Sequence, residues 1–167
     1  TIIGIYAFSY RLFMKLTKSG FASMVGALTY LFSPLVFNYI NMGCNFVLVF
    51  LALAPLFIQI SMDYFEKGKP WHVVALGLIT SISFFQSQAI VWLPLLFICV
   101  FLSQITRENL LKSLGKFLLA SIAIGLIVIL IHLPWLLLII INPSSVTNST
   151  STLDLKRFSE VLSVSNQ

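Results

Sequence analysis

The chain has 167 residues, of which 59% are apolar and only 9% are charged, against about 45–50% and about 25% in soluble domains. This composition excludes an ordinary soluble domain, a disordered chain and a disulfide scaffold. The net charge of +5 does not indicate nucleic-acid binding. The reason is that the basic residues of the chain lie in short loops between apolar runs, as the orientation of a membrane protein requires.

Three long stretches, residues 19–62, 70–106 and 117–153, contain no Asp, Glu, Lys or Arg. Because ~20 apolar residues cross a bilayer as a helix, the first two stretches are each long enough for a helical hairpin. The sequence therefore predicts an all-α fold, a polytopic transmembrane helical bundle. We expect about six spans, several of them short or proline-kinked, at residues 2–16, 19–32, 44–62, 71–85, 89–103 and 117–141.

Prolines interrupt several of these segments. Ser33-Pro34 is expected to end the second, whereas Pro55, Pro94 and Pro134 fall inside the third, fifth and sixth. A proline inside a helix removes one hydrogen bond and clashes with the preceding turn. The freed backbone groups must find partners in neighbouring helices or in a water-lined cavity.

The basic residues predict an orientation, since cytoplasmic loops are rich in Lys and Arg. With the loop after the first segment in the cytoplasm, only Lys156 and Arg157 are external. Both ends of the chain then lie outside. The cytoplasmic basic residues are Arg11, Lys15, Lys18, Lys67, Lys69, Arg107, Lys112 and Lys116.

Residues 1–141 are expected to form the transmembrane region, and residues 142–167 an external polar tail. Because the chain starts with Thr1 and enters an apolar run at once, we expect a fragment of a longer protein. The tail carries a glycosylation sequon at Asn148. Residues 151–154 fit a capping box, and we expect a short amphipathic helix after it, either on the membrane surface or packed on the bundle.

Neutral amides and aromatic rings gather in three predicted external elements, which are the linker 33–43, the turn 86–88, and the end of the sixth segment with the tail from Asn142. These groups can hydrogen-bond sugar hydroxyls and stack on sugar faces, but they are also the residues that membrane interfaces favour. The substrate-cavity candidates are Asn38, Tyr39, Asn41, Gln86, Gln88, His132 and Trp135.

A functional role is one hypothesis for His132, because ionisable groups inside spans are costly. The alternative is structural, since a neutral His can hydrogen-bond to a carbonyl freed by Pro134. No metal site is expected, since no other His, Asp or Glu lies near His132 in the sequence. A general base on the external side would have to be Asp154, Glu160 or a residue outside this chain. The catalytic residues therefore stay unassigned.

The run from Gly26 to Gly43 (GALTYLFSPLVFNYINMG), followed by LALAPL at residues 51–56, resembles the middle spans of GT-C type membrane glycosyltransferases. A similar pattern occurs in the membrane family labelled as related to pyruvoyl-tetrahydropterin synthase. The basic loop 68–71 and the polar turn 86–88 continue the resemblance, which covers about residues 20–102.

The resemblance implies inverting transfer of a sugar from a polyprenyl-phosphate carrier on the external or lumenal face. In the GT-C family, the catalytic acidic residue belongs to the first external loop, which matches no position in this sequence. A divalent cation in the full protein would offset the charge of the carrier phosphate. The expected partners are membrane lipid and the carrier-linked sugar, in the cell membrane or the endoplasmic reticulum. A transporter or lipid-carrier flippase and a non-catalytic assembly subunit remain as alternatives.

Overall fold

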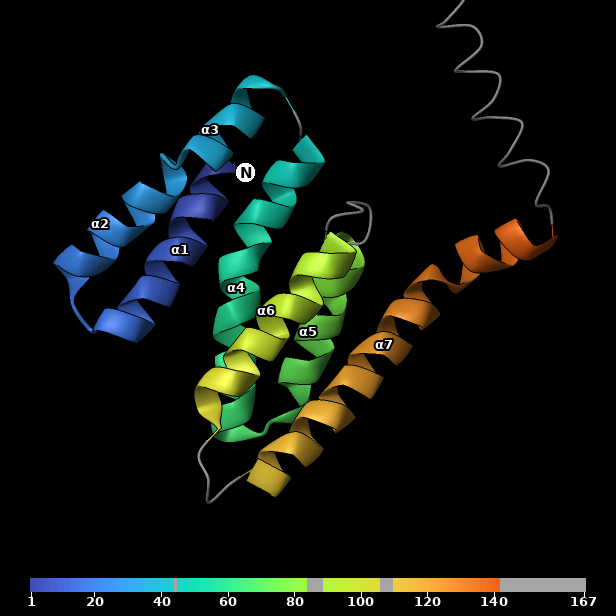
Figure 1. Cartoon of the computed structure of the whole chain (residues 1–167). Coiled ribbons are helices and arrows are strands. Elements are labelled where there is room, and N and C mark those ends of the chain that lie inside the picture. Colours follow the sequence, from blue (N-terminus) through green and yellow to red (C-terminus); the bar gives the residue numbers. More distant parts are fainter. Residues whose placement is uncertain (44, 84–88, 106–109, 142–167) are drawn as a thin grey trace, which may run out of the picture. The chain divides into compact units, whose positions relative to one another are not determined.

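The computed structural model describes residues 1–43, 45–83, 89–105 and 110–141 (Figure 1). Within these ranges the chain forms α-helices and no strand, which confirms the predicted all-α fold. The helices are α1 (Ile2–Thr17), α2 (Gly20–Leu31), α3 (Pro34–Asn41), α4 (Asn45–Lys67), α5 (Pro70–Ser83), α6 (Ala89–Gln104) and α7 (Leu110–Ile141). The chain divides into two compact units, Thr1–Val128 and Ile129–Gln167.

Two described helices are long and apolar enough to cross a membrane, at Val47–Lys67 and Ser113–Pro134. A third crossing results if α2 and α3, bent by 46° at their junction, form one broken span. The six expected spans are therefore not confirmed. The reason is length, because a helix of 14 residues such as α5 is only about 21 Å long, against about 30 Å of hydrocarbon.

Serine and proline set the boundaries between the first three helices. Ser19 caps α2 by accepting a hydrogen bond from the Ala22 backbone N–H, and Ser33 caps α3 in the same way. Pro34 occupies the first turn of α3, where its missing N–H costs nothing. The Ser33-Pro34 corner thus ends α2 as expected, but the linker that follows it is a helix.

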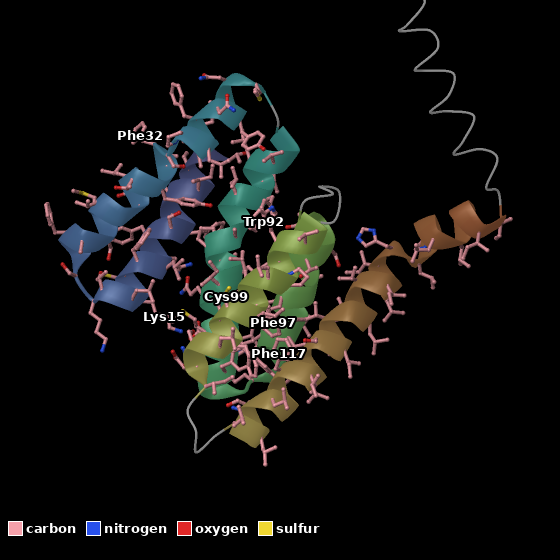
Figure 2. All side chains as sticks on the ribbon, in the orientation of Figure 1. Lys15, Phe32, Trp92, Phe97, Cys99 and Phe117 are labelled. Carbon is pink, nitrogen blue, oxygen red and sulfur yellow. The ribbon has the colours of Figure 1, made fainter. Side chains whose placement is uncertain are left out.

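Helix α4 is the central element of the first unit, and it packs against α1, α3, α5 and α6. Its Phe57 is 2% exposed and lies edge-on to Phe97 of α6, with ring centroids 6.2 Å apart. Phe97 stacks in turn on Phe117 of α7 at 5.2 Å, and Figure 2 shows these two rings close together. Aromatic contacts therefore join three helices within one core.

Three buried serines in the first unit place their hydroxyl hydrogen bonds inside their own helices. Ser9, Ser61 and Ser81 each donate to the carbonyl four residues earlier, at 2.6 to 2.8 Å, although each is at most 4% exposed. Helices in hydrocarbon need this arrangement, because an unpaired polar group there costs several kcal/mol. These three serines follow the pattern that hydrocarbon favours, whereas the buried Ser83 hydroxyl of α5 has no hydrogen-bond partner among the described residues.

The carbonyl that Pro55 frees in α4 has a partner on α2. Proline has no N–H, so the carbonyl of Leu51, four residues earlier, loses its helical donor. The Tyr30 hydroxyl donates to this oxygen at 2.9 Å. The expectation that proline-freed groups find partners in neighbouring helices is confirmed at this position.

The second unit begins within α7, and its described part ends at Ile141. This part contains His132, which is 8% exposed, and Pro134, which lies inside the helix. Leu136 and Ile140 are 39% and 73% exposed, so a large share of their apolar surface remains uncovered.

Candidate functional site

An apolar pocket of about 570 Å³ lies among α1, α2, α3, α4 and α6 in the first unit. Its volume falls within the range of about 300–1,000 Å³ that is typical of ligand sites. The lining residues are Ser9, Leu12, Phe13, Tyr30, Leu35, Tyr39, Val47, Phe50, Leu51, Ala54, Pro55, Ile58, Trp92 and Leu96.

The lining has few polar atoms, and two of its hydroxyl groups donate hydrogen bonds to backbone carbonyls. Ser9 donates to the Ile5 carbonyl at 2.6 Å, and Tyr30 donates to the Leu51 carbonyl. Among the described residues, no Asp, Glu, Lys or Arg lines the pocket. The walls therefore suit a hydrocarbon ligand rather than a charged one.

The pocket extends along α4. Its lining residues on this helix run from Val47 to Ile58, which corresponds to about 16 Å along the axis. Trp92 of α6, labelled in Figure 2, also lines it and is 50% exposed. A space that follows a helix over this length favours a chain-shaped ligand.

The structure brings one of the sequence-predicted site residues into this pocket, Tyr39 of α3. Asn38 and Asn41 lie on the same helix with exposed side chains and do not line it. His132 and Trp135 belong to α7 in the second unit, and the Trp135 side chain lies outside the described residues. So do Gln86, Gln88, Asn148 and the tail with its predicted amphipathic helix.

Sequence reasoning did not identify most of the pocket. Ser9, Leu12 and Phe13 were expected only as part of a first span, and Trp92 as part of the fifth. Tyr30 could have been found, because Pro55 predicts an unpaired carbonyl and Tyr30 belongs to a neighbouring apolar segment. For the other residues the local sequence contains no signal of a cavity.

A charged cluster lies at the end of α1 and α4. The Lys15 ammonium contacts Asp63 Oδ1 at 3.2 Å and Glu66 Oε1 at 3.3 Å. Lys67 contacts the same Asp63 oxygen at 2.8 Å. The side chains of Lys15 and Asp63 are about one-fifth exposed, so this pair ties the two helices together in a partly desolvated setting.

In the described part of the chain, no three His, Cys, Asp or Glu side chains come together as a metal site. Its carboxylates, Asp63 and Glu66, are occupied by lysines. These residues do not fit a divalent cation. Glu108, Asp154 and Glu160, the remaining carboxylates of the sequence, lie outside the described residues.

Comparison with protein-family models, with curated proteins and with solved structures gives no match to this chain.

Proposed function

We propose that this chain is part of a multi-pass membrane glycosyltransferase that takes its sugar from a polyprenyl-phosphate carrier, and that the apolar pocket holds a segment of the carrier's hydrocarbon chain. The pocket is the observation that carries the proposal. Its lining follows α4 from Val47 to Ile58, includes no charged side chain among the described residues, and encloses the volume of a ligand site. The resemblance of residues 20–102 to GT-C type enzymes supplies the substrate class.

Membrane embedding is supported by large apolar side chains that remain exposed on several helices. Phe21 of α2 is 75% exposed, Val91 of α6 67% and Leu119 of α7 68%. A monomeric soluble protein rarely shows apolar surface on this scale, whereas lipid covers it at no cost. In the proposed topology α1, α2 with α3, α4, α5, α6 and α7 make six crossings, and the shorter helices require local thinning of the bilayer.

The residues of this chain would bind and orient the carrier rather than perform the transfer. A hydrocarbon segment in the pocket would contact Phe13, Phe50 and Ile58. Tyr39, which also lines the pocket, lies on the same helix as the exposed amides Asn38 and Asn41, which suit the polar part of the carrier. Residues outside the described ranges would supply the general base that activates the acceptor. They would also supply the ligands of any cation that binds the carrier phosphate.

Blocking the pocket tests this proposal. In the full protein, Ala54→Trp places an indole at the lining, and Ala7→Trp places the same ring at an exposed position of α1. With a diazirine-labelled polyprenyl-phosphate sugar in membranes, we expect Ala54→Trp to lose most of the photolabelling and sugar transfer that the parent protein shows. Ala7→Trp should retain both, and equal labelling of the two variants would contradict the proposal.

A transporter or flippase is the second candidate, and the proline inside α4 favours it. Pro55 lines the pocket, and Pro94 lies inside α6, which also contributes to the lining. Proline-interrupted helices at a substrate site are typical of transporters. The same photolabelling would then persist, but the labelled carrier would change leaflets without loss of its sugar. An assembly subunit would show neither reaction.

The proposed topology predicts that the turn after α4 faces the cytoplasm. A cysteine in place of the exposed Lys69, with Cys44 and Cys99 replaced by serine, should resist a membrane-impermeant maleimide added from outside to intact cells. It should react fully once the membrane is opened. Labelling from outside would reverse the orientation.

A further inference from the structure

Lysines from separate helices gather at one end of the first unit. Lys15 in the last turn of α1 reaches Asp63 and Glu66 near the end of α4. Lys116 of α7 donates to the Phe65 carbonyl at 3.2 Å, and its ammonium lies about 3.7 Å from where a side chain on Gly68 would begin. The ends of α1 and α4 and the start of α7 therefore meet in one charged layer.

The positive charge in this layer exceeds the negative charge. Asp63 and Glu66 are both paired with Lys15, and Asp63 also with Lys67. Among the described side chains of this layer, two carboxylates against five lysines leave three positive charges. The five are Lys15, Lys18, Lys67, Lys69 and Lys116. Lys18 and Lys69 are exposed, and no carboxylate of the described chain forms an ion pair with them.

Exposed apolar side chains lie one or two residues from these cations along the chain. Leu16, next to Lys15, is 54% exposed, and Trp71, two residues after Lys69, is 57% exposed. On α7, Leu118 is 52% exposed and follows Lys116 by two residues. Trp is enriched where a protein meets the boundary between hydrocarbon and headgroups. A layer of lysines bordered by apolar side chains on three helices matches the depth profile of one leaflet.

We propose that this end of the first unit binds the anionic headgroups of phospholipids in the leaflet that it faces. The inference rests on the membrane embedding in the proposed function, and it adds a lipid partner that the transfer reaction does not require. A lysine ammonium is a compact point charge that binds phosphate without a fixed geometry, so Lys18 and Lys69 suit mobile lipid headgroups. Nucleic acid is disfavoured as the partner because the apolar border would then face water.

Lipid selectivity in a defined bilayer tests the proposal. The full protein is reconstituted into vesicles of phosphatidylcholine, and spin-labelled phosphatidylglycerol and spin-labelled phosphatidylcholine are compared for the fraction that the protein immobilises. We expect the parent to prefer phosphatidylglycerol at low salt and to lose this preference in 1 M KCl, where the Debye length falls to about 3 Å.

The double variant Lys18→Gln/Lys69→Gln should lower the preference several-fold, with about fivefold per lysine as the upper bound. Its matched control, Lys18→Arg/Lys69→Arg, keeps both charges and should retain the preference. Equal immobilisation of both lipids by the parent, or an unchanged preference in the Gln variant, would overturn the inference and leave the carrier-binding proposal intact. Failure of the parent to enter the bilayer would overturn both.

Discussion

Replacing Tyr30 by Phe is expected to destabilise the protein by about 1–2 kcal/mol, because the Leu51 carbonyl would then have no donor. Tyr30 supplies this hydrogen bond at 2.9 Å only because Pro55 removes the one that the helix would provide. A buried acceptor left unpaired costs about 1–3 kcal/mol, and hydrogen bonds between membrane helices contribute about 0.6 to 2 kcal/mol. The ring itself stays in place, so the packing term is small.

A double-mutant cycle with Pro55→Ala isolates this effect. Alanine at residue 55 restores the backbone N–H that bonds the Leu51 carbonyl within α4, so Tyr30→Phe should then cost less than about 0.5 kcal/mol. Unfolding of the detergent-solubilised protein, followed by tryptophan fluorescence during denaturation in sodium dodecyl sulfate, gives the four free energies. A coupling energy near zero would show that the tyrosine does not compensate for the proline.

Tyr6→Phe is the matched control for the loss of a hydroxyl group. Tyr6 belongs to α1 and stacks on Tyr10, with ring centroids 6.2 Å apart. Within the described residues its hydroxyl makes no hydrogen bond, so the variant should be nearly neutral in both backgrounds. A loss equal to that of Tyr30→Phe would mean that the measurement reports a general effect of removing tyrosine hydroxyls.

The same hydrogen bond connects stability to the proposed site. Tyr30, Leu51 and Pro55 all line the pocket, and the bond ties α2 to α4 at its wall. Tyr30→Phe should therefore weaken carrier photolabelling as well as stability, whereas Tyr6→Phe should change neither. This is the clearest link between a local sequence feature, the interior proline, and the function proposed for the chain.

The sequence predicts the helices well because their boundaries have local causes. Charged or polar residues separate the apolar runs, and Ser33-Pro34 ends one helix where a proline cannot continue it. The serine cap that makes this corner also starts α3, which the sequence pattern does not predict. An eight-residue amphiphilic segment with two asparagines has no strong helical signal of its own.

The number of spans and the pocket could not be read from the sequence for different reasons. Composition shows that a segment tolerates hydrocarbon, but crossing also needs length, and only α4 and α7 meet both conditions as single helices. The pocket depends on how five helices pack, and no local pattern encodes the gap between them. Of the predicted candidates on α3, Tyr39 is partly buried and lines the pocket, whereas the side chains of Asn38 and Asn41 are exposed.

Substituting Gly77 by Ala is expected to destabilise the protein by about 1–3 kcal/mol, the cost of overpacking a close contact. Gly77 is buried in α5, and a methyl group there would lie 2.8 to 2.9 Å from three side-chain atoms of Ile127 on α7. One of these atoms is the Ile127 Cβ, which cannot move without the backbone of α7. The two helices would have to separate at this point.

Gly115→Ala provides the matched control for this prediction. Gly115 also lies inside a helix, but a methyl group there meets nothing within 4 Å. Alanine favours helix over glycine by about 1 kcal/mol, so this variant should be neutral or stabilising, and the two alanine variants should differ by about 1–4 kcal/mol. Detergent unfolding as above measures both, and equal stabilities would contradict the close approach of α5 and α7.

Adding Ile127→Ala to Gly77→Ala tests whether the contact itself is the cause. The second substitution removes two of the three crowding atoms, Cγ2 and Cδ1, so the double variant should be more stable than the sum of the single effects by about 1 kcal/mol. Strict additivity would show that Gly77 is required for another reason, such as the backbone of α5. A favourable coupling would establish that a glycine allows α7, the most exposed of the membrane-length helices, to pack closely on α5.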